Sequence, residues 1–406
     1  MTVGGPAAES RLLVLGAGVF QLSIIRRARE LGAYVITADH TPSNPGHRIA
    51  NQTIDCSTIE TAEIISQARQ LGIDGVVTAA SDVAVVTVAA VRSVLGLPGA
   101  FTPELSNTFS TKPAFREFLR REGLSSQRYY FSDSIETIVE AVRGFTFPVV
   151  TKPADSSGSR GVILVSEPDE LEEALRLSVF FSRSGVVGAE EFLPGVEYGG
   201  DLFVKAGRIE HLCVTDKHLE QFTVKGHVLP SRVQPAGEAL ICAALDRLCN
   251  RLGYKEGPMN FDVKIDGQHV NLIEVSPRLG GNSIPDLIRR STGLDFEAMS
   301  VLQALGLDVT LEENQPHGMA GSVILGATRP SIVSYLPSLT EMRSLVNAVW
   351  NVQWAKGVGE SVNPMANAGD MIGVVCFDCI DQTDYEVSRR RLEDWTENVM
   401  CSDDAS

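Results

Sequence analysis

The sequence predicts an α/β protein that begins with a doubly wound parallel sheet and continues as an α+β region. Three observations support this prediction. Short apolar strands alternate with amphipathic helices over about the first 100 residues, which is typical of a parallel sheet covered by helices. A loop rich in glycine and serine then joins two apolar runs at 149–165, and a hairpin carrying two acids follows at 260–276.

The N-terminal part alternates between strands and helices in a regular order. Its strands are short and apolar, and its helices have an amphipathic pattern. A turn at Leu97-Pro98-Gly99 closes the unit. The expected elements are strands at 11–15, 34–38 and 75–78, with helices ending at about 31 and spanning 61–71 and 83–95.

Two features of this unit leave alternatives open. The segment Gly16-Ala17-Gly18 resembles the turn of a dinucleotide-binding fold, with Asp39 placed to bind ribose, but Gln21 replaces the third glycine. NAD binding is therefore an alternative to a turn that binds no phosphate or faces a substrate. Ser81 and Asp82 follow the carboxyl end of a strand, where such sheets bind ligands, and are equally suited to capping the next helix.

Composition limits the classes of function. A chain of 406 residues with 44% hydrophobic residues suggests two or three globular domains. The net charge of −16 argues against a nucleic-acid partner, so an anionic cofactor would need a local positive pocket. The longest apolar run, 83–91, is too short to span a bilayer, and residues 1–10 contain no apolar signal core. We therefore expect a cytoplasmic protein without a membrane partner.

The seven cysteines are scattered and predict no disulfide framework. Cys376 and Cys379 form a CxxC pair within a run that has the pattern of a strand. Because side chains alternate along a strand, these two thiols would point to opposite faces of the sheet. We expect ordinary buried cysteines there, without a metal or redox role.

The stretch 149–165 has the pattern of two strands joined by a flap, with Lys152 at the end of the first strand. Glycines let the backbone come close to a ligand, and successive N–H groups form an anion-binding nest. The loop is not a Walker A motif, because its Lys precedes the glycines and a strand follows. The alternative is a surface hairpin with an ordinary Lys. The small residues of the flap are Ser156, Ser157, Gly158, Ser159 and Gly161.

Other charged residues stand near predicted turns and helix ends. Lys112 begins a helix, where the N-terminus already favours anions. Residues 123–147 predict a helix hairpin or a small lobe, and a strand after it ends in Glu190-Glu191. Glu197 follows at the start of the next strand, and 226–231 predicts a loop. None of these features identifies a site by itself.

The strongest chemical signal is the hairpin at 260–276, which turns at Asp266-Gly267. Folding there brings Asp262 near Glu274, and two carboxylates in apolar runs repel each other unless a cation joins them. Oxygen ligands favour Mg²⁺, which bridges to nucleotide phosphates. Arg278 and the backbone N–H groups of 280–281 follow directly and suit a carboxylate or phosphoryl group. The alternative is a surface hairpin with an incidental Arg.

The order of these parts resembles the ATP-grasp superfamily over nearly the full length of the chain. The segments that carry the resemblance are VVTKPADSSGSRGV, AEEFLPGVEY, GHVLPS and NLIEVSPRLGGN. The similarity is greatest to L-amino-acid ligases and related carboxylate-amine ligases, and more distant to D-alanine:D-alanine ligase, biotin carboxylase and carbamoyl phosphate synthase. It implies an N-terminal domain at 1–107, a nucleotide-binding region at 108–312 with a lid at about 124–188, and a C-terminal lobe at 313–406.

The resemblance also implies roles for individual residues, with ATP and two Mg²⁺ ions as cofactors and Mn²⁺ as an alternative ion. The implied ATP contacts are Lys112, Lys152, Ser156, Ser157, Gly158, Ser159, Gly161, Glu190, Glu191, Leu193 and Glu197. The implied catalytic residues are Lys217 near the γ-phosphate, Arg278 and Gly281 at the acyl phosphate and tetrahedral intermediate, and His227 at the developing oxyanion. The implied metal ligands are Asp262, Glu274 and Ser276, which replaces the Asn of many members and weakens the case for a second ion.

The activity implied by the resemblance is amide formation. An ATP-dependent ligase would join a small-molecule carboxylate, such as an amino acid or a specialised metabolite, to an amine through an acyl phosphate, with release of ADP and phosphate. A homodimer is compatible with the resemblance. The alternatives are a carboxylase or formyl transferase like those of purine synthesis, and a non-catalytic nucleotide-binding regulator. The sequence names neither substrate.

Overall fold

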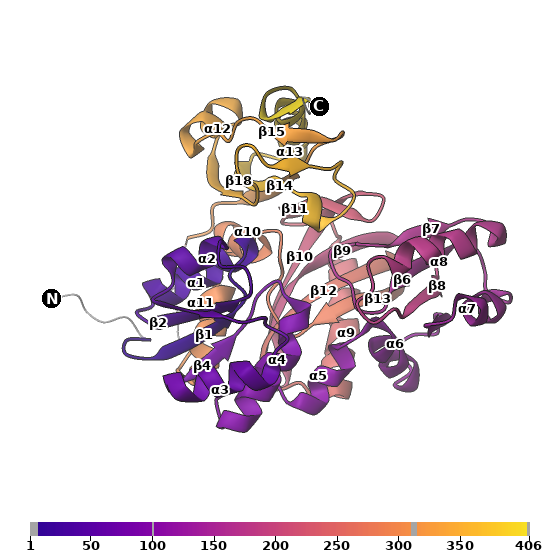
Figure 1. Cartoon of the computed structure of the whole chain (residues 1–406), viewed down its shortest axis with the longest axis horizontal. Helices are drawn as coiled ribbons and strands as arrows, with labels where there is room; N and C mark the ends of the chain where they lie inside the picture. The colour runs from indigo at the N-terminus through magenta and orange to yellow at the C-terminus, as the bar shows by residue number, and fades with distance from the viewer. Residues whose placement is uncertain (1–6, 100, 310–314, 404–406) are drawn as a thin grey trace.

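The structure is a computed structural model that describes residues 7–99, 101–309 and 315–403. Three parts of the chain are arranged around a long antiparallel sheet, as the colours of Figure 1 show: an indigo unit, a magenta lobe at the right and a yellow lobe at the top. The predicted boundary at residue 312 lies outside the described residues. Within the described ranges, no helix combines the length and apolar character needed to cross a bilayer.

The N-terminal unit is a parallel sheet with strand order β3-β2-β1-β4. The predicted doubly wound sheet is confirmed, but sequence patterns missed α2 and β3. The strand β3 lies at the sheet edge and buries only one of its residues, so its apolar signal is weak. The elements are β1 Arg11–Leu15, η1 Val19–Gln21, α1 Leu22–Glu30, β2 Tyr34–Asp39, α2 Pro45–Ile49, β3 Gln52–Asp55, α3 Thr61–Leu71, β4 Gly75–Val77 and α4 Asp82–Leu95.

Two helices, α5 Pro103–Phe109 and α6 Lys112–Arg121, lead to a lobe with its own antiparallel sheet, in the order β5-β8-β6-β7. The predicted flap is confirmed, because β6 and β7 pair across it. Of the two predictions for 123–147, the small lobe is confirmed and the helix hairpin is wrong: α7 is the only helix there among the described residues, and 129–132 form β5, whose aromatic residues favour a strand and pair with β8. The elements are β5 Tyr129–Ser132, α7 Ile135–Val142, β6 Val149–Pro153, β7 Ile163–Val165, η2 Pro168–Glu170, α8 Leu171–Val179 and β8 Val187–Glu191.

The central sheet has eight strands in the order β13-β12-β9-β10-β11-β14-β18-β16. The loop predicted at 226–231 is wrong over most of its length, because 226–229 belong to β11, which pairs with β10 and β14. Position 226 in this strand requires glycine, because the Cβ atom of any other residue would collide with the Ser322 carbonyl and with Tyr385. The strands are β9 Val196–Lys205, β10 Arg208–Glu220, β11 Thr223–Leu229, β12 Gly257–Asp266, β13 His269–Ser276, β14 Met319–Leu325, β16 Val349–Trp354 and β18 Gly373–Cys379.

Of the remaining elements, α9 packs on the central sheet, α10 and α11 join that sheet to the N-terminal unit, and the others belong to the C-terminal lobe, which has a small sheet of order β17-β15-β19. Cys376 and Cys379 belong to different hydrophobic clusters, which confirms that they point to opposite faces of β18. All seven cysteines of the chain are free thiols. The elements are α9 Pro235–Leu252, α10 Ile284–Thr292, α11 Phe296–Ala304, β15 Ser331–Val333, α12 Leu339–Leu345, β17 Ser361–Val362, η3 Ala368–Asp370, α13 Gln382–Trp395, η4 Thr396–Met400 and β19 Cys401–Asp403.

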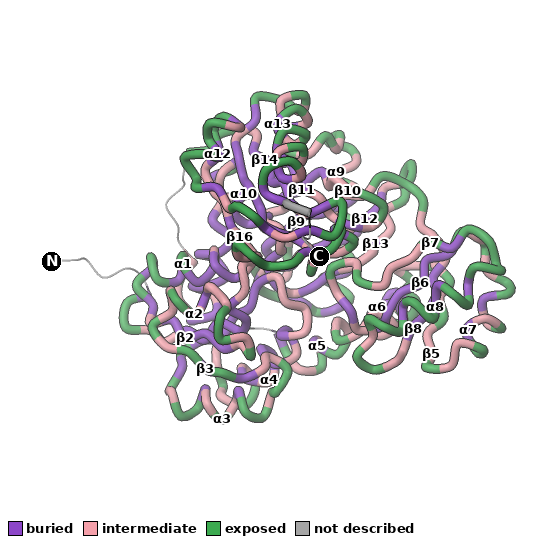
Figure 2. The backbone as a smooth tube through the Cα atoms, turned by 45° about the horizontal axis from the view of Figure 1, so that its top comes forward, coloured by how far each residue is buried: buried purple, intermediate pink, exposed green. Residues whose placement is uncertain are grey.

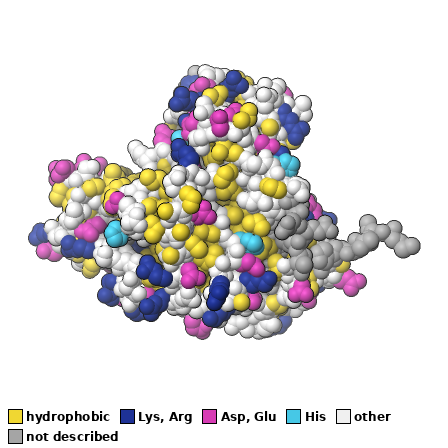
Figure 3. All heavy atoms as spheres, turned by 180° about the vertical axis from the view of Figure 1, so that it is seen from behind, with side chains coloured by type: hydrophobic (Ala, Val, Ile, Leu, Met, Phe, Trp, Pro, Cys, Tyr) yellow, Lys and Arg dark blue, Asp and Glu magenta, His cyan; other side chains and the backbone are white. Residues whose placement is uncertain are grey.

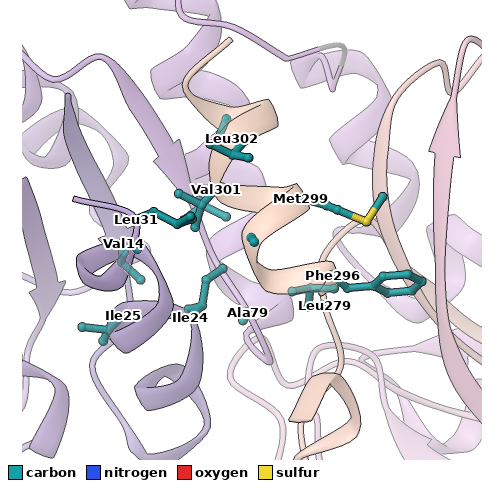
Figure 4. Packing of buried hydrophobic residues seen from close by; sticks show 14 of the residues in the cluster. Val14, Ile24, Ile25, Leu31, Ala79, Leu279, Phe296, Met299, Val301 and Leu302 are labelled. Atoms are coloured by element: carbon teal, nitrogen blue, oxygen red, sulfur yellow. The ribbon is translucent and has the colours of Figure 1, made fainter. Parts of the chain in front are cut away.

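Among the described residues, the largest core cluster joins the N-terminal unit to α10, α11 and the middle strands of the central sheet. Figure 4 shows Val14 and Ile24 packed with Val301 of α11, a helix that follows them by more than 270 residues. Leu279 belongs to the same cluster, and its carbonyl accepts a hydrogen bond from Ala80 N at 2.9 Å. This packing fixes the loop after β13 against the carboxyl end of β4.

Buried residues and charged side chains are distributed differently over the molecule. In Figure 2 the buried backbone is concentrated in the sheets, whereas the outer sides of the helices are exposed. On the face seen in Figure 3, Lys and Arg side chains are interspersed with Asp and Glu. Charges of both signs therefore alternate over the part of that face that the structure describes.

Candidate active site

A cavity of about 360 Å³ lies where the flap, the central sheet and the N-terminal unit meet. All but two of the predicted site residues line it, and the exceptions are Gly161 and Ser276. The structure thus brings together residues from the flap and its lobe, helix α6, five strands of the central sheet and the loop after β13. The lining members of the predicted set are Lys112, Lys152, Ser156, Ser157, Gly158, Ser159, Glu190, Glu191, Leu193, Glu197, Lys217, His227, Asp262, Glu274, Arg278 and Gly281.

The flap is tied to its surroundings on both sides of the cavity. Lys112, the first residue of α6, donates from Nζ to the Ser156 carbonyl at 2.5 Å. Ser159 Oγ donates to the Phe222 carbonyl at 2.6 Å, and Gly158 O accepts from Ala368 N at 3.1 Å. The cavity is therefore covered by a loop that contacts α6, the turn between β10 and β11, and the C-terminal lobe.

Gly161 has a different place from the other flap residues. Its φ is +73°, a conformation that favours glycine, and an added Cβ would lie 2.9 Å from Phe181. Its absence of a side chain lets the end of the flap pack on Phe181. In this structure the glycine shapes the flap without lining the cavity.

Lys152 is held by a buried ion-pair network at one wall of the cavity. Its Nζ lies 2.6 Å from Glu190 Oε2, and Arg116 donates to both Glu190 oxygens at 3.0 and 3.1 Å. Burial raises the pKa of Glu190, but Arg116 and Lys152 outweigh it and bring the pKa to about 2. Burial lowers the pKa of Lys152, and Glu190 opposes that effect. Glu190 is thus an anion that keeps Lys152 charged and oriented.

Sequence patterns missed Arg116, although one signal was present. Arg116 stands among Phe115, Phe118 and Leu119 on α6, and all four side chains are buried. An Arg within the apolar stripe of a helix needs a partner, because an unpaired buried cation is costly. The partner lies 74 residues away, so the sequence could indicate the need for a partner but not its identity.

Four strands contribute the charged group at the centre of the cavity. Asp262 on β12 stands directly opposite Glu274 on β13, which confirms the pairing that the hairpin predicted. Lys217 on β10 places its Nζ 2.8 Å from Asp262 Oδ1 and 2.7 Å from Glu197 Oε1. Burial raises the pKa of Asp262, and Glu197 and Glu274 add to that effect while Lys217 opposes it. The paired acids therefore favour an added cation.

The donor set fits Mg²⁺ bound together with a nucleotide. Across the described ranges, no group of three or more His, Cys, Asp or Glu side chains is arranged to hold a metal. Asp262 and Glu274 alone would leave most positions around Mg²⁺ to phosphate oxygens and water, which is the usual arrangement for this ion.

Ser276 does not share the position of these two acids at the cavity. It is 4% exposed and pairs with Asn260 across the hairpin. Its Oγ is buried and makes no hydrogen bond within the described residues. A ligand role for Ser276 would require this hydroxyl to reach the cavity that Asp262 and Glu274 line.

Arg278 is fixed by groups from two parts of the chain. Its Nε and Nη2 donate to Asp82 Oδ1 at 2.9 and 2.5 Å, and its Nη1 donates to Asn260 Oδ1 at 2.9 Å. Asp82 thus pairs with an arginine, and Ser81 makes no side-chain cap to α4. Asp201, also missed, accepts from Gly280 N at 3.0 Å. These contacts hold the loop that carries Arg278 and Gly281.

His227 is 2% exposed and lies on β11 opposite Lys217 on β10. Its Nδ1 is 2.9 Å from Thr215 Oγ1, which itself donates to the Gly199 carbonyl at 3.0 Å. Burial, together with the charge of Lys217, lowers the pKa of His227 to about 3. The imidazole is therefore neutral at physiological pH.

The residues that suggested NAD have other partners. Gln21 donates from Nε2 to the Ala79 carbonyl at 2.6 Å and packs against Gly16 and Gly18. Asp39 accepts from Ala17 N and from Thr41 N, both at 2.9 Å. The side chain of Gln21 thus occupies the space beside the glycine turn where a pyrophosphate would approach.

Comparisons with known proteins agree with this arrangement. Residues 145–286 match the ATP-grasp domain family. Carnosine synthase 1 of Mus musculus is 26% identical over 334 residues, which cover 74% of this chain and 40% of that protein. The formate-dependent phosphoribosylglycinamide formyltransferase of Maridesulfovibrio salexigens is 26% identical over 329 residues, which cover 79% of this chain and 81% of that protein.

Solved structures agree over nearly the whole chain. The L-amino acid ligase of Bacillus licheniformis aligns with a TM-score of 0.79 at 20% identity, covering 95% of this chain and 98% of that one. The N5-carboxyaminoimidazole ribonucleotide synthetase of Thermus thermophilus aligns with a TM-score of 0.70 at 18% identity, covering 94% and 97%. The chain spans only 40% of the length of the mouse and human carnosine synthases. The predicted resemblance is confirmed: the chain has the ATP-grasp fold and carries an ATP-grasp domain at residues 145–286.

Proposed function

We propose that this protein is an ATP-dependent, ADP-forming ligase that joins a small-molecule carboxylate to an amine. The main support for this proposal is the set of side chains that lines the cavity. Paired acids on one hairpin, two lysines beside a flap and a fixed arginine meet in one space of about 360 Å³. Phosphoryl transfer depends on positioning and charge neutralisation, which this set supplies. The names of two relatives, carnosine synthase and L-amino acid ligase, support the same reaction class.

In the proposed reaction, a carboxylate oxygen attacks the γ-phosphorus of ATP, the bond to ADP breaks, and an acyl phosphate forms. An amine then attacks the acyl carbon, the bond to phosphate breaks, and an amide is left. Mg²⁺ bound by Asp262 and Glu274 would neutralise charge on the phosphates. Lys112 and Lys152 would hold the phosphates, and the flap would exclude water from the acyl phosphate.

The nucleotide base would lie beside the segment 191–193, where β8 ends. Lys264 donates from Nζ to the Leu193 carbonyl at 3.0 Å and lies 4.1 Å from the centre of the Phe192 ring. These contacts leave the backbone of 191–193 fixed beside the cavity, where it would bind adenine. Because Glu190 is paired with Lys152 and Arg116, we propose that it acts on ATP through Lys152. Glu197 remains the proposed ribose contact and Lys217 the proposed γ-phosphate contact.

The substrates would enter at the other end of the cavity. We assign to that end the lining residues Phe20, His227, Arg278, Asn282 and Ile284. Arg278 supplies a guanidinium for the developing charge on the acyl group, and its contact with Asp82 fixes the direction of that guanidinium. Gly281 also lines this end, and its N–H is the proposed second donor.

Several finer features belong to the same proposal. The division into 1–107, 108–312 with a lid at about 124–188, and 313–406 follows the family pattern, as do a second Mg²⁺, Mn²⁺ as an alternative ion and a homodimer. A cytoplasmic location is supported by seven free cysteines, since oxidising compartments favour disulfides. The predicted absence of nucleic-acid and membrane partners rests on composition.

The test is ADP release by the purified protein with Mg-ATP across a matrix of amino acids and small carboxylates, alone and in pairs. Glu274→Ala is the blank. Release that requires a particular pair, with a product lighter by one water than the sum of the pair, would establish the ligase. Release with bicarbonate or formate in place of such a pair would instead indicate chemistry like that of the purine-pathway relatives.

A further inference from the structure

The tautomer of His227 follows from the hydrogen bonds of Thr215. A carbonyl oxygen only accepts, so the single hydroxyl proton of Thr215 is donated to the Gly199 carbonyl, 3.0 Å away. The contact of 2.9 Å between Thr215 Oγ1 and His227 Nδ1 then needs its proton from the ring. The ring proton therefore lies on Nδ1. Since the imidazole is neutral, Nε2 carries a lone pair and no proton.

Nε2 is the only ring nitrogen left for a ligand. His227 lines the cavity and is 2% exposed, and no donor among the described residues reaches Nε2. A buried acceptor without a donor is unfavourable, so this atom calls for an N–H or O–H group. The same tautomer is at odds with a role at the oxyanion, because Nε2 has no proton to donate.

The charge around His227 selects among donors. Lys217 lies opposite it across the β10–β11 pair, and its positive charge helps to lower the pKa of the imidazole. A permanently charged ammonium would be repelled there, and it would pair better with a carboxylate. An uncharged amine presents an N–H to a neutral acceptor and keeps its own lone pair for attack. The environment therefore suits the attacking amine in its reactive, neutral form.

We propose that Nε2 of His227 accepts a hydrogen bond from the attacking amine and thereby directs the nitrogen lone pair at the acyl carbon. This inference rests on the proposed ligase function and extends it to the recognition of the nucleophile. The nitrogen forms the C–N bond, the C–O bond to phosphate breaks, and the leaving phosphate keeps the electron pair. The nitrogen loses one proton as the amide forms, and the leaving phosphate, a stronger base than this buried imidazole, takes that proton. Thr215 is a positioning residue, because it acts only through the tautomer.

The first experiment needs no substrate. NMR of the imidazole nitrogens in the full-length protein distinguishes protonated from unprotonated ring nitrogens, and the spectrum of His227→Gln assigns the signal. We expect Nδ1 protonated and Nε2 unprotonated at neutral pH. A protonated Nε2 in the wild-type protein would overturn the proposal, whatever the outcome of the ADP-release matrix.

The second experiment compares Thr215→Val with Thr215→Ser, using the amine that the matrix identifies. Thr215 is fully buried and does not line the cavity, so Val removes the hydroxyl without altering the cavity wall. Loss of the acceptor at Nδ1 lets the proton move to Nε2, and we expect KM for the amine to rise about tenfold, the usual effect of one hydrogen bond. KM for ATP should stay within about twofold, and Ser should preserve the wild-type values.

The KM for the amine and the tautomer of His227 in Thr215→Val together decide whether Nε2 binds the amine. A selective rise for the amine in Thr215→Val, with the NMR signal showing a protonated Nε2, would support it. An unchanged KM for the amine in a variant whose Nε2 is protonated would overturn it. If Thr215→Val fails to fold, the tautomer of the wild-type protein still decides the question.

Discussion

Replacing Glu190 by Gln would remove the anion that lies between two buried cations. Glu190 is 1% exposed, and its partners Lys152 and Arg116 are 7% and 3% exposed. Gln keeps the size of the side chain but has no charge, so both cations would lose their counterion. Lys152 would then release its proton more easily, because burial already lowers its pKa. We expect a less stable protein with weaker affinity for ATP.

The magnitude follows from the pKa of Glu190, which falls from 4.5 to about 2 on folding. At about 1.4 kcal/mol for each pH unit, the charged carboxylate stabilises the folded state by about 3 kcal/mol at pH 7. Since the folded pKa is the lower one, this contribution is complete above pH 4.5 and is lost as the pH falls toward 2. About 2 kcal/mol should remain at pH 3.5.

The assay is urea unfolding of the wild-type protein and Glu190→Gln at pH 7 and pH 3.5. The stability difference should be about 3 kcal/mol at pH 7 and should narrow by about 1 kcal/mol at the lower pH. Glu117→Gln is the matched control, because Glu117 also pairs with an Arg on α6 but is exposed, and its urea midpoint should stay near that of the wild type. Equal stability of the wild type and Glu190→Gln at pH 7 would show that the charge of the buried carboxylate does not stabilise the fold.

Three further predictions concern the cavity. Glu274→Ala should lower the rate of ADP formation at least about 100-fold, since Asp262 alone holds Mg²⁺ poorly, and nearly wild-type release would remove the metal assignment. Asp82→Asn should lower the ratio of amide to ADP about tenfold and leave ATP binding unchanged by calorimetry, because Arg278 loses its charged partner; an unchanged ratio would contradict this. Gly158→Ala should weaken ATP binding about tenfold, because Gly158 has a φ of +66° and an added Cβ would lie 2.8 Å from Ala368. An ATP affinity equal to that of the wild type would show that the flap tolerates displacement.

Features set by short-range rules were predictable from the sequence. The β12–β13 hairpin turns at Asp266-Gly267, and the turn fixes the register that places Asp262 opposite Glu274. The parallel N-terminal sheet follows from regular alternation of strands and helices. The flap was predictable because two apolar runs lie on either side of small residues.

Contacts made by packing of distant segments were not predictable. Asp82 and Arg278 are 196 residues apart, and they meet because the loop after β13 pairs with the end of β4. The sequence offered Asp82 only as a helix cap or a ligand contact. His227 was predicted to lie in a loop, yet it is fixed between two strands, and Thr215, which sets its tautomer, gave no signal in the sequence.

Oxygen-isotope labelling distinguishes a reaction through an acyl phosphate from other routes to the amide. The carboxylate substrate identified by the matrix is labelled with heavy oxygen, and the phosphate released with the amide is analysed by mass spectrometry. Reaction through an acyl phosphate predicts one labelled oxygen atom in each phosphate, because the carboxylate oxygen leaves with the phosphoryl group. Unlabelled phosphate from a reaction that still forms the amide would contradict the proposed mechanism.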